Sequence, residues 1–271
     1  MIFNDYRNKA VLITGGTAGI GLATGLAFAR HGARVYLTHR WASADEQAIK
    51  SRFEDEGCPE PVILEADASS REDTLNLIRE IRKSHASIEA FISNVSFGHI
   101  SKSPRDLDRR SLLISLKYST WPILDYLKTI KAEMGKYPRY AVAMSSKGPD
   151  SYHFGYDFIA ASKIALEILC RQLTAALIHE DIRINALAPN PVFTQSFEAT
   201  FGPDFKPYLE TQLGQYGRWY IILPEEVARA ALALCGGGMD AMKGQVLKLD
   251  RGCCFSESLY RIYAFNTGKC D

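Results

Sequence analysis

The stretch AVLITGGTAGIGLA, residues 10–23, sets the architecture that the rest of the chain follows. Its beginning, Ala10–Thr14, is a short apolar and β-branched run of the kind found in buried strands. Glycines then occupy positions 15, 16, 19 and 21, and helix-forming residues begin at Leu22. Glycine permits a tight turn and a close approach of the backbone to a pyrophosphate, which a helix N-terminus also attracts. The stretch therefore predicts a strand, a phosphate-binding turn and a helix, the context that a dinucleotide site requires.

The same alternation of short apolar runs and longer helical patterns continues along the chain. Helical patterns occupy segments such as Gly21–His31, Ala44–Glu56, Arg71–Ser84 and Ile159–His179. The strand candidates are Ala10–Thr14, Arg34–Thr38, Val62–Ala66, Ala90–Asn94, Tyr140–Ser145, Arg183–Ala188 and Gln245–Leu249. Strands separated by helix-length segments indicate βαβ units joined by right-handed crossovers. We therefore expect a single α/β domain over residues 1–271, with a Rossmann-type doubly wound parallel sheet of about seven strands.

Composition excludes several classes of partner. The formal net charge is +1, from 32 Lys and Arg against 31 Asp and Glu, which provides no general field for nucleic acid or anionic lipid. No segment reaches the ~18 uninterrupted apolar residues of a membrane span, and the charged N-terminus is unlike a signal peptide. The six cysteines and six histidines lack the spacing of a disulfide scaffold or a zinc site. We expect a cytoplasmic protein with reduced thiols, no metal, and no nucleic-acid or membrane partner.

Residues 190–223 interrupt the alternation. The segment contains prolines, glycines and many aromatic residues, and it has no evident strand. Long loops inside compact domains usually serve function, and ligands of open α/β sheets bind where strands end. We therefore predict a substrate lid at residues 190–223 that excludes water and favours an apolar or acyl substrate. A subunit contact is the alternative, because aromatic residues are enriched there as well.

The end of the second predicted strand bears on the choice of cofactor. NAD-binding folds usually carry a carboxylate here that bonds the ribose 2′-hydroxyl. In this chain the strand ends in Thr38-His39-Arg40, and no carboxylate appears until Asp45. A cationic Arg40 suits the 2′-phosphate of NADPH better than the bare hydroxyl of NADH. We therefore expect NADPH, with NADH less favoured; the alternative is that Arg40 only caps a surface loop.

The order and spacing of these motifs resemble those of the short-chain dehydrogenase/reductase superfamily over about residues 9–252. Under this resemblance Asp67 contacts the adenine, Ser93–Ser96 stands where the family has an Asn-Asn-Ala-Gly turn, and Thr194 contacts the nicotinamide carboxamide. The resemblance implies cofactor contacts from Gly15, Thr17, Gly19, Ile20, Gly21, Arg40, Asp67, Ala68, Asn94, Lys163, Pro189 and Thr194. Asn190 replaces the usual glycine of a Pro-Gly turn, a position where Asn tolerates a left-handed backbone.

The catalytic segment departs from the common pattern of the superfamily. Ile159 stands four residues before Lys163, where a tyrosine is usual, and Tyr156 stands seven before it. A Tyr-x6-Lys spacing is similar to that of the enoyl-acyl-carrier-protein reductase branch, and with this glycine motif it resembles the divergent NADPH-using members. A second similarity is the segment Ser115–Ser119, in which Lys117 or Ser119 falls where ordinary members keep a catalytic Asn.

The resemblance implies a role for each catalytic candidate. Tyr156 stabilises an enolate oxygen, and Lys163 bonds the nicotinamide ribose and lowers the pKa of the phenol. Ser146 contacts the substrate, with Ser145 as its alternative, and Tyr152 could supplement Tyr156. On a helix, an offset of seven residues places the phenol about 4.5 Å further along the axis than an offset of four. Such a displacement suits enoyl reduction, in which charge develops two carbons away from the carbon that accepts hydride.

These observations leave three functions open. The leading hypothesis is an NADPH-dependent reductase of an enoyl thioester, from a fatty-acid-like or specialised acyl or polyketide pathway. The second is a carbonyl reductase or alcohol dehydrogenase of the same superfamily, and the third is a non-catalytic dinucleotide-binding protein. The superfamily also suggests a homo-oligomer, a dimer or a tetramer, with the extended tail 253–271 packed on a neighbouring subunit. A catalytic thiol at Cys253 or Cys254 has no identifiable histidine partner.

Overall fold

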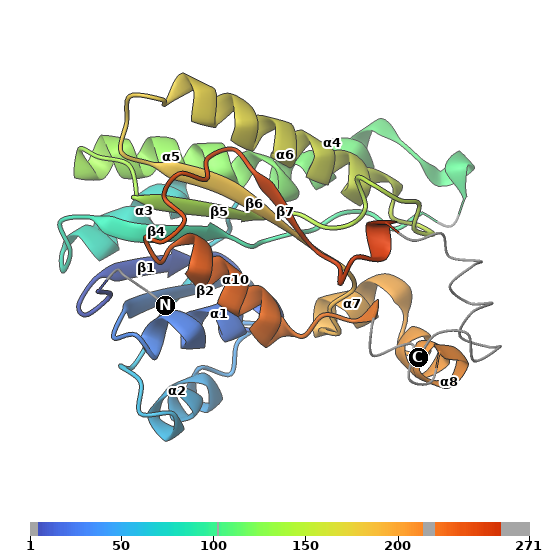
Figure 1. Ribbon diagram of the computed structural model, residues 1–271, viewed down its shortest axis with the longest axis horizontal. Helices are drawn as coiled ribbons and strands as arrows, with labels where there is room; N and C mark the ends of the chain where they lie inside the picture. Colours follow the sequence, from blue (N-terminus) through green and yellow to red (C-terminus); the bar gives the residue numbers. More distant parts are fainter. Residues whose placement is uncertain (1–4, 102, 214–219, 256–271) are drawn as a thin grey trace.

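The computed structural model describes residues 5–101, 103–213 and 220–255, which form a layered α/β structure (Figure 1). Its sheet is parallel throughout, with the strand order β3-β2-β1-β4-β5-β6-β7. The strands are β1 (Ala10–Ile13), β2 (Arg34–His39), β3 (Val62–Glu65), β4 (Ile88–Ser93), β5 (Tyr140–Met144), β6 (Arg183–Pro189) and β7 (Val246–Leu249). Each predicted strand is present, so the predicted Rossmann-type sheet is confirmed.

Helices cover both faces of the sheet. Their bounds are α1 (Gly19–Ala29), α2 (Glu46–Asp55), α3 (Arg71–Arg82), α4 (Arg109–Ser119), α5 (Trp121–Met134), α6 (Asp157–Ala176), α7 (Gln195–Phe201), α8 (Phe205–Leu213) and α10 (Pro224–Leu234), with short 3-10 turns η1 (Pro104–Asp106) and η2 (Cys253–Phe255). In Figure 1, α4, α5 and α6 lie on one side of the sheet, and α1, α2 and α10 on the other. Within the described residues, no helix combines the length and apolar character needed to cross a bilayer.

Two hydrophobic cores result, one on each face. Val11 and Ile13 of β1 belong to the core shared with α1 and α10, whereas Ala10 and Leu12 belong to the core shared with α3, α5 and α6. Successive side chains of a strand point to opposite faces, and every residue of β1 and β5 is buried. Continuous apolar runs, rather than alternating ones, therefore mark these central strands.

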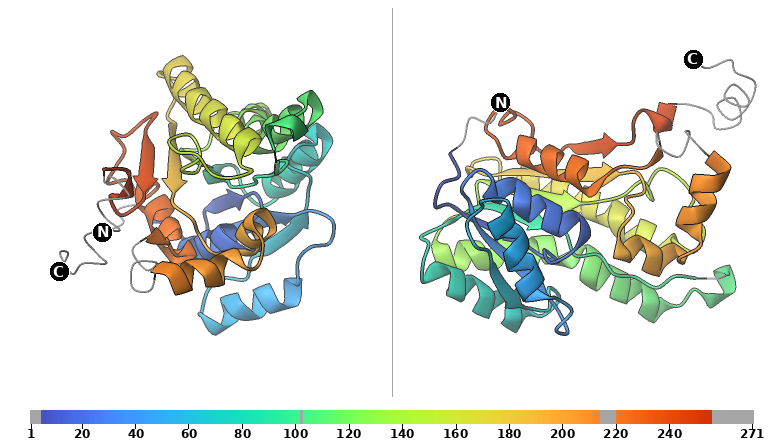
Figure 2. Two further views of the ribbon diagram at one scale, coloured as in Figure 1. Left: turned by 90° about the vertical axis from the view of Figure 1, so that its right-hand side faces the viewer. Right: turned by 90° about the horizontal axis from the view of Figure 1, so that it is seen from below.

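The structure differs from the sequence prediction in the segment that was expected to form a lid. Residues 190–223 are partly helical rather than a loop, because α7 and α8 lie within them, beyond the carboxyl ends of the strands (Figures 1 and 2). The Thr194 side chain caps α7 by accepting from the Phe197 N–H. Phe193, Phe197, Phe201 and Phe205 recur every four residues and pack against one another, which is the helical signal in this segment. Residues 214–219 of the lid and 256–271 of the tail lie outside the described residues.

Tyr6 joins the N-terminal segment to the residue that follows α10, and the contribution of this contact to stability can be tested. Its hydroxyl donates to the Cys235 carbonyl at 2.8 Å, and its ring packs edge-on against Phe28. We expect Tyr6→Phe to lower the free energy of unfolding by about 1 kcal/mol, because the ring stays and one buried hydrogen bond is lost. Urea denaturation measures this, with exposed Tyr208→Phe as the matched control. Equal midpoints for the two variants would contradict the contribution of the bond.

Candidate active site

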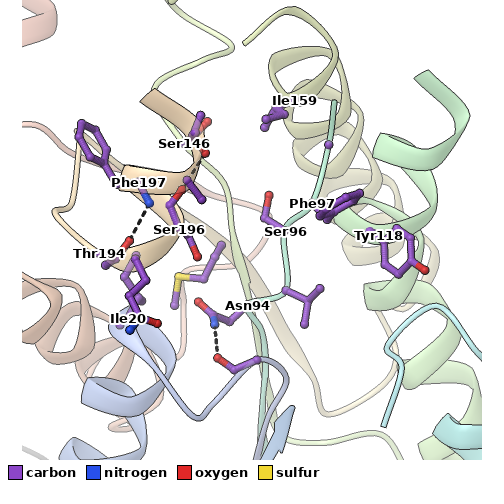
Figure 3. Close-up of a pocket in the computed structure, with 18 of the residues that line it drawn as sticks. Ile20, Asn94, Ser96, Phe97, Tyr118, Ser146, Ile159, Thr194, Ser196 and Phe197 are labelled. Carbon is purple, nitrogen blue, oxygen red and sulfur yellow. Dashed lines mark hydrogen bonds between the residues drawn. The ribbon is translucent and has the colours of Figure 1, made fainter. Parts of the chain in front are cut away.

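A cavity of about 590 Å³ runs along the carboxyl ends of the strands, where open α/β sheets bind ligands (Figure 3). Its two ends differ in chemistry. One is polar, around Arg40 and Asp67, and the other is aromatic, around Phe197 and Phe201. The predicted site residues that line it are Gly15, Thr17, Gly19, Ile20, Arg40, Asp67, Ala68, Asn94, Ser146, Tyr156, Lys163, Pro189 and Thr194. The structure thus brings together residues from six strand ends.

The glycine-rich turn between β1 and α1 would let a phosphate group come close to the backbone. Gly21 does not line the cavity, but a Cβ on it would lie 2.2 Å from the Gly15 carbonyl oxygen, so the turn requires glycine there. The Asn94 amide donates to the carbonyls of Thr14 and Gly15 at 3.2 and 2.9 Å, which fixes the turn (Figure 3). Ala18, the N-cap of α1, has no side chain to cap the helix. The first N–H groups of α1 are therefore left for an anion in the cavity.

Arg40 points into the polar end of the cavity rather than capping a surface loop. Its Nη1 donates to the Asp67 carboxylate at 2.7 Å and to the Tyr118 hydroxyl. Its guanidinium lies 3.3 Å from the centre of the Trp41 ring, on a backbone turn where Trp41 has a φ of 59°. Partial burial opposes ionisation of Asp67, yet hydrogen bonds from Ser69 and the charge of Arg40 hold its pKa below the usual value. The arrangement is a fixed cation–carboxylate pair beside aromatic rings.

Tyr156 directly precedes α6, as its N-cap, with φ and ψ of −95° and 7°. The predicted helix Ile159–His179 thus begins two residues earlier, at Asp157, and the phenol comes from just outside it. Gly148 lies against the ring, since a Cβ on it would be 2.7 Å from Tyr156 Cε1. Burial raises the pKa of the phenol, and a hydrogen bond with Ser146 offsets part of the rise. Tyr152, by contrast, is 80% exposed and lies outside the cavity lining.

The two adjacent serines after β5 have different surroundings. The Ser145 hydroxyl donates to the buried side of the Glu167 carboxylate at 2.6 Å. Ser146 is the serine whose hydroxyl lies beside Tyr156, and Figure 3 shows it at the cavity. The geometry therefore favours Ser146 over its alternative Ser145.

Lys163 is buried within α6, with 3% of its surface exposed. Its Nζ donates to the Met144 carbonyl at the end of β5 at 2.7 Å. Burial lowers its pKa to about 8, against the attraction of Glu167 one turn further along the helix. A cation with a readily lost proton therefore borders the cavity.

Ile159 occupies the position one helical turn before Lys163 and lines the cavity with an apolar side chain. It is 4% exposed and packs tightly beside Gly98, where an added Cβ would lie 2.6 Å from Ile159 Cγ1. Of the tyrosines in the described part of the chain, Tyr118 and Tyr156 line this cavity, and Tyr118 is bound at its polar end. The phenol available near Lys163 is therefore that of Tyr156.

Three expectations for neighbouring residues need correction. Lys117 is exposed, with its ammonium 5.5 Å from the Tyr118 ring centre, and Ser119 bonds the backbone of Phe97. Neither lines the cavity, so neither stands in for a catalytic Asn. Asn190 does not have a left-handed backbone; instead its amide donates to the Tyr220 carbonyl at 3.1 Å, which ties the end of β6 to the lid.

Cys253 and Cys254 lie in η2, beyond β7. The Asp250 carboxylate accepts from the Cys254 N–H at 3.0 Å, and its hydrogen bond with the thiol raises the pKa of Cys254. A raised pKa disfavours the nucleophilic thiolate. In the parts of the chain that the structure describes, no group of three His, Cys, Asp or Glu side chains could hold a metal ion.

The cavity also contains residues that the sequence analysis did not predict as site residues. Phe201 and His153 border Tyr156, and Tyr118 reaches Arg40 from α4. The four-residue spacing of the phenylalanines could have indicated Phe201. Nothing local in the sequence indicates the contact between Tyr118 and Arg40, because they are 78 positions apart.

Comparison with known proteins places the chain in a family. Residues 15–254 match the family described as enoyl-(acyl carrier protein) reductase. The chain is 26% identical over 265 residues to general stress protein 39 of Bacillus subtilis, covering 92% of this chain and 88% of that one. It is 24% identical over 208 residues to the chloroplastic NADPH-dependent aldehyde reductase 1 of Arabidopsis thaliana, covering 74% and 71% of the two chains.

A solved structure supports the same fold. A 7α-hydroxysteroid dehydrogenase complexed with NADH and 7-oxo glycochenodeoxycholic acid superposes with a TM-score of 0.78 at 21% identity, covering 91% of this chain and 94% of that one. The chain belongs to the matched family, within the short-chain dehydrogenase/reductase superfamily, and is an NAD(P)H-dependent oxidoreductase. The predicted superfamily and enzyme class are confirmed, and the hypothesis of a non-catalytic protein is set aside.

Burial of Lys163 predicts a pH-dependent stability. In the unfolded chain the lysine keeps its proton up to its ordinary pKa of 10.5, whereas the folded protein releases it near pH 8. Between these values the unfolded state binds more protons, so the cost of burying the charge is fully present below pH 8 and disappears toward pH 10.5. Relative to Lys163→Met, the wild type should gain about 3 kcal/mol of unfolding free energy across this window.

Urea denaturation of both proteins at several pH values measures the difference. The exposed Lys128→Met is the control, and its curve should run parallel to that of the wild type. A parallel curve for Lys163→Met as well would show that the Lys163 ammonium is not buried.

Proposed function

We propose that the protein reduces the carbon–carbon double bond of an enoyl thioester with NADPH. The proposal rests on the side chains found at two positions before Lys163, namely Ile159 and Tyr156. Apolar Ile159 lines the cavity one turn before the lysine, and the Tyr156 phenol comes from the residue before α6. The match to the family described as enoyl-(acyl carrier protein) reductase supports the same chemistry.

The proposed reaction separates the site of hydride addition from the site of charge. NADPH, when bound, would supply the hydride, and C3 of the acyl chain is the carbon that would accept it. Negative charge then develops on the thioester oxygen, two carbons away, and a donor is needed there. Tyr156 donates to this oxygen, with the Ser146 hydroxyl beside it, while Ile159 presents no proton near C3. Lys163, a cation close to Tyr156 in the chain, favours the phenolate that remains after proton donation.

The residues that would hold NADPH follow the length of the cavity. The backbone of Gly15, Gly19 and Ile20 would bind the pyrophosphate at the N-terminus of α1, and Asp67 would bind the adenine. Arg40 would bind the 2′-phosphate, because it lines the cavity and its described hydrogen bonds use only Nη1. Ala68, Asn94, Thr17, Pro189, Lys163 and Thr194 are proposed to complete the site.

The proposed preference for NADPH depends on the Arg40 charge. We expect Arg40→Leu to weaken NADPH binding about tenfold or more, since a charge-assisted bond to phosphate is lost, and to leave NADH binding nearly unchanged. Quenching of intrinsic fluorescence by each cofactor measures both dissociation constants. Arg30→Leu removes a cation at the far end of α1 and should change neither constant. An equal loss for NADH and NADPH would contradict the role of Arg40.

The proposed proton donor can be removed without changing the ring. Tyr156→Phe should lower kcat on an enoyl thioester by about a hundredfold or more, the usual contribution of a general acid, with unchanged NADPH binding. Tyr152→Phe, at an exposed position seven residues before Ile159, is the matched control and should retain wild-type kcat. A wild-type rate for Tyr156→Phe would contradict the proposed function.

Carbonyl reduction is the second candidate, and one observation favours it. Ser146 and Tyr156 lie side by side, so their two hydroxyls could converge on a single carbonyl oxygen. The similarity to an aldehyde reductase is consistent with this chemistry. An enoyl and a 3-oxoacyl thioester of equal chain length, compared by NADPH consumption, distinguish the two candidates.

We also propose that the protein acts as a homo-oligomer on a small-molecule or acyl-thioester substrate. Large apolar side chains on α4, α5 and α6 are exposed in the single chain, among them Leu113, Trp121, Ile164 and Ile168. Contact between copies would cover them. Sedimentation at several protein concentrations measures the assembly.

A further inference from the structure

The Tyr156 ring has neighbours from two segments, α7 and the connection between β5 and α6. Its centre is 6.0 Å from that of Phe201, the last residue of α7, with the ring planes 20° apart. The His153 ring stands edge-on to it at 5.8 Å. Gly148 leaves no space for a side chain, because its added Cβ would lie 2.7 Å from the ring. Phe201 is thus the aromatic side chain stacked on the proposed proton donor.

Phe201 is itself held in place by the remainder of α7. Its ring packs on Phe197 at 4.8 Å and on Phe205 at 5.5 Å between centres. At the other end of the helix, Thr194 lies against the glycine turn, since a Cβ on Gly19 would be 2.9 Å from Thr194 Cγ2. Figure 3 shows α7 along the side of the cavity, with Phe197 and Ser196 on it. The short helix therefore spans from the phosphate turn to the phenol.

We propose that Phe201 is a positioning residue that holds the Tyr156 phenol beside Ser146, where it meets the substrate oxygen. This inference rests on the proposed function, in which Tyr156 is the proton donor. The phenol needs such support because Tyr156 is the N-cap of α6, with no side-chain capping bond, and its ring borders the cavity. A smaller side chain at position 201 leaves the ring free to rotate and admits water, and a displacement of about 1 Å can cost a hundredfold in rate.

The contact with Phe201 also affects the pKa of the Tyr156 phenol. Burial is what raises the pKa of Tyr156, and Phe201 provides part of the cover. The charged or titratable groups around this part of the cavity are His153 and Lys147 from the segment after β5 and Lys163 from α6; the cavity-lining residues of α7 are uncharged. A smaller residue at position 201 therefore lowers the pKa of the phenol, so the decline in rate caused by ionisation of Tyr156, which follows that of Lys163 near pH 8, moves to lower pH.

A double-mutant cycle tests the inference. The four proteins are the wild type, Phe201→Leu, Tyr156→Phe and the double variant, assayed with an enoyl thioester and NADPH. We expect Phe201→Leu to lower kcat roughly tenfold to a hundredfold and to shift the decline in rate at high pH to lower pH. In the Tyr156→Phe background the same substitution should change kcat less than about twofold, because Phe201 acts through the phenol.

Two further variants separate positioning from folding. Phe193→Leu removes a ring that packs on Phe197 in the same aromatic cluster, and it should retain the wild-type kcat and pH profile. Phe201→Tyr keeps a stacking ring and should restore most of the rate. Thermal unfolding and NADPH binding of each protein report whether the fold and the cofactor site persist.

The outcomes distinguish this inference from the function on which it rests. If Tyr156→Phe keeps the wild-type rate, the proposed function fails and the role of Phe201 falls with it. If Tyr156→Phe loses the rate but the loss from Phe201→Leu is additive, or equals that of Phe193→Leu, the positioning role alone is overturned. An unchanged pH profile in Phe201→Leu would overturn it as well.

Discussion

A buried ammonium group fixes the catalytic helix on the sheet. Lys163 donates to the Met144 carbonyl at the last residue of β5, so α6 cannot shift along β5 without leaving a charge unpaired in the interior. The same strand end carries Ser145 and Ser146, and Ser145 is bonded to Glu167 on α6. Helix and strand are thus joined by two buried polar contacts, and the positions of Tyr156 and Ile159 follow from that attachment.

The cavity combines two kinds of surface, and the chemistry depends on their separation. At its polar end the cation of Arg40, the carboxylate of Asp67 and the helix N-terminus suit a phosphorylated dinucleotide. At its aromatic end the apolar side chains of Phe197, Phe201 and Ile159 would exclude water and suit the proposed acyl chain. Charged groups in a dry site interact strongly, which is what a developing oxyanion requires. In the proposed reaction, the aromatic surface therefore contributes to the chemistry as well as to substrate binding.

The sequence predicts the sheet well because its central strands are buried on both faces, and continuous apolar runs record that burial directly. The glycine turn is also predicted well from the sequence, since the fold has no room for a Cβ at position 21 and therefore requires glycine there. Contacts between distant segments are different. Ser145 and Ser146 both line the cavity, and which of them bonds to Glu167 depends on how β5 packs against α6. The pairing of Arg40 with Asp67 joins residues 27 positions apart. The helices α7 and α8 in the predicted lid were missed because its prolines and glycines suggested a loop, although the four-residue spacing of its phenylalanines indicated a helix.

The carbon that receives the hydride distinguishes enoyl reduction from carbonyl reduction in a single reaction. A conjugated enone presents both an activated double bond and a carbonyl group, so one molecule offers both reactions to the same enzyme. With NADPH deuterated at the transferring position, NMR of the product identifies the carbon that received deuterium. If the protein reduces the double bond, deuterium will lie on the β-carbon of a saturated ketone; deuterium on the carbinol carbon of an allylic alcohol would show that it reduces the carbonyl group instead.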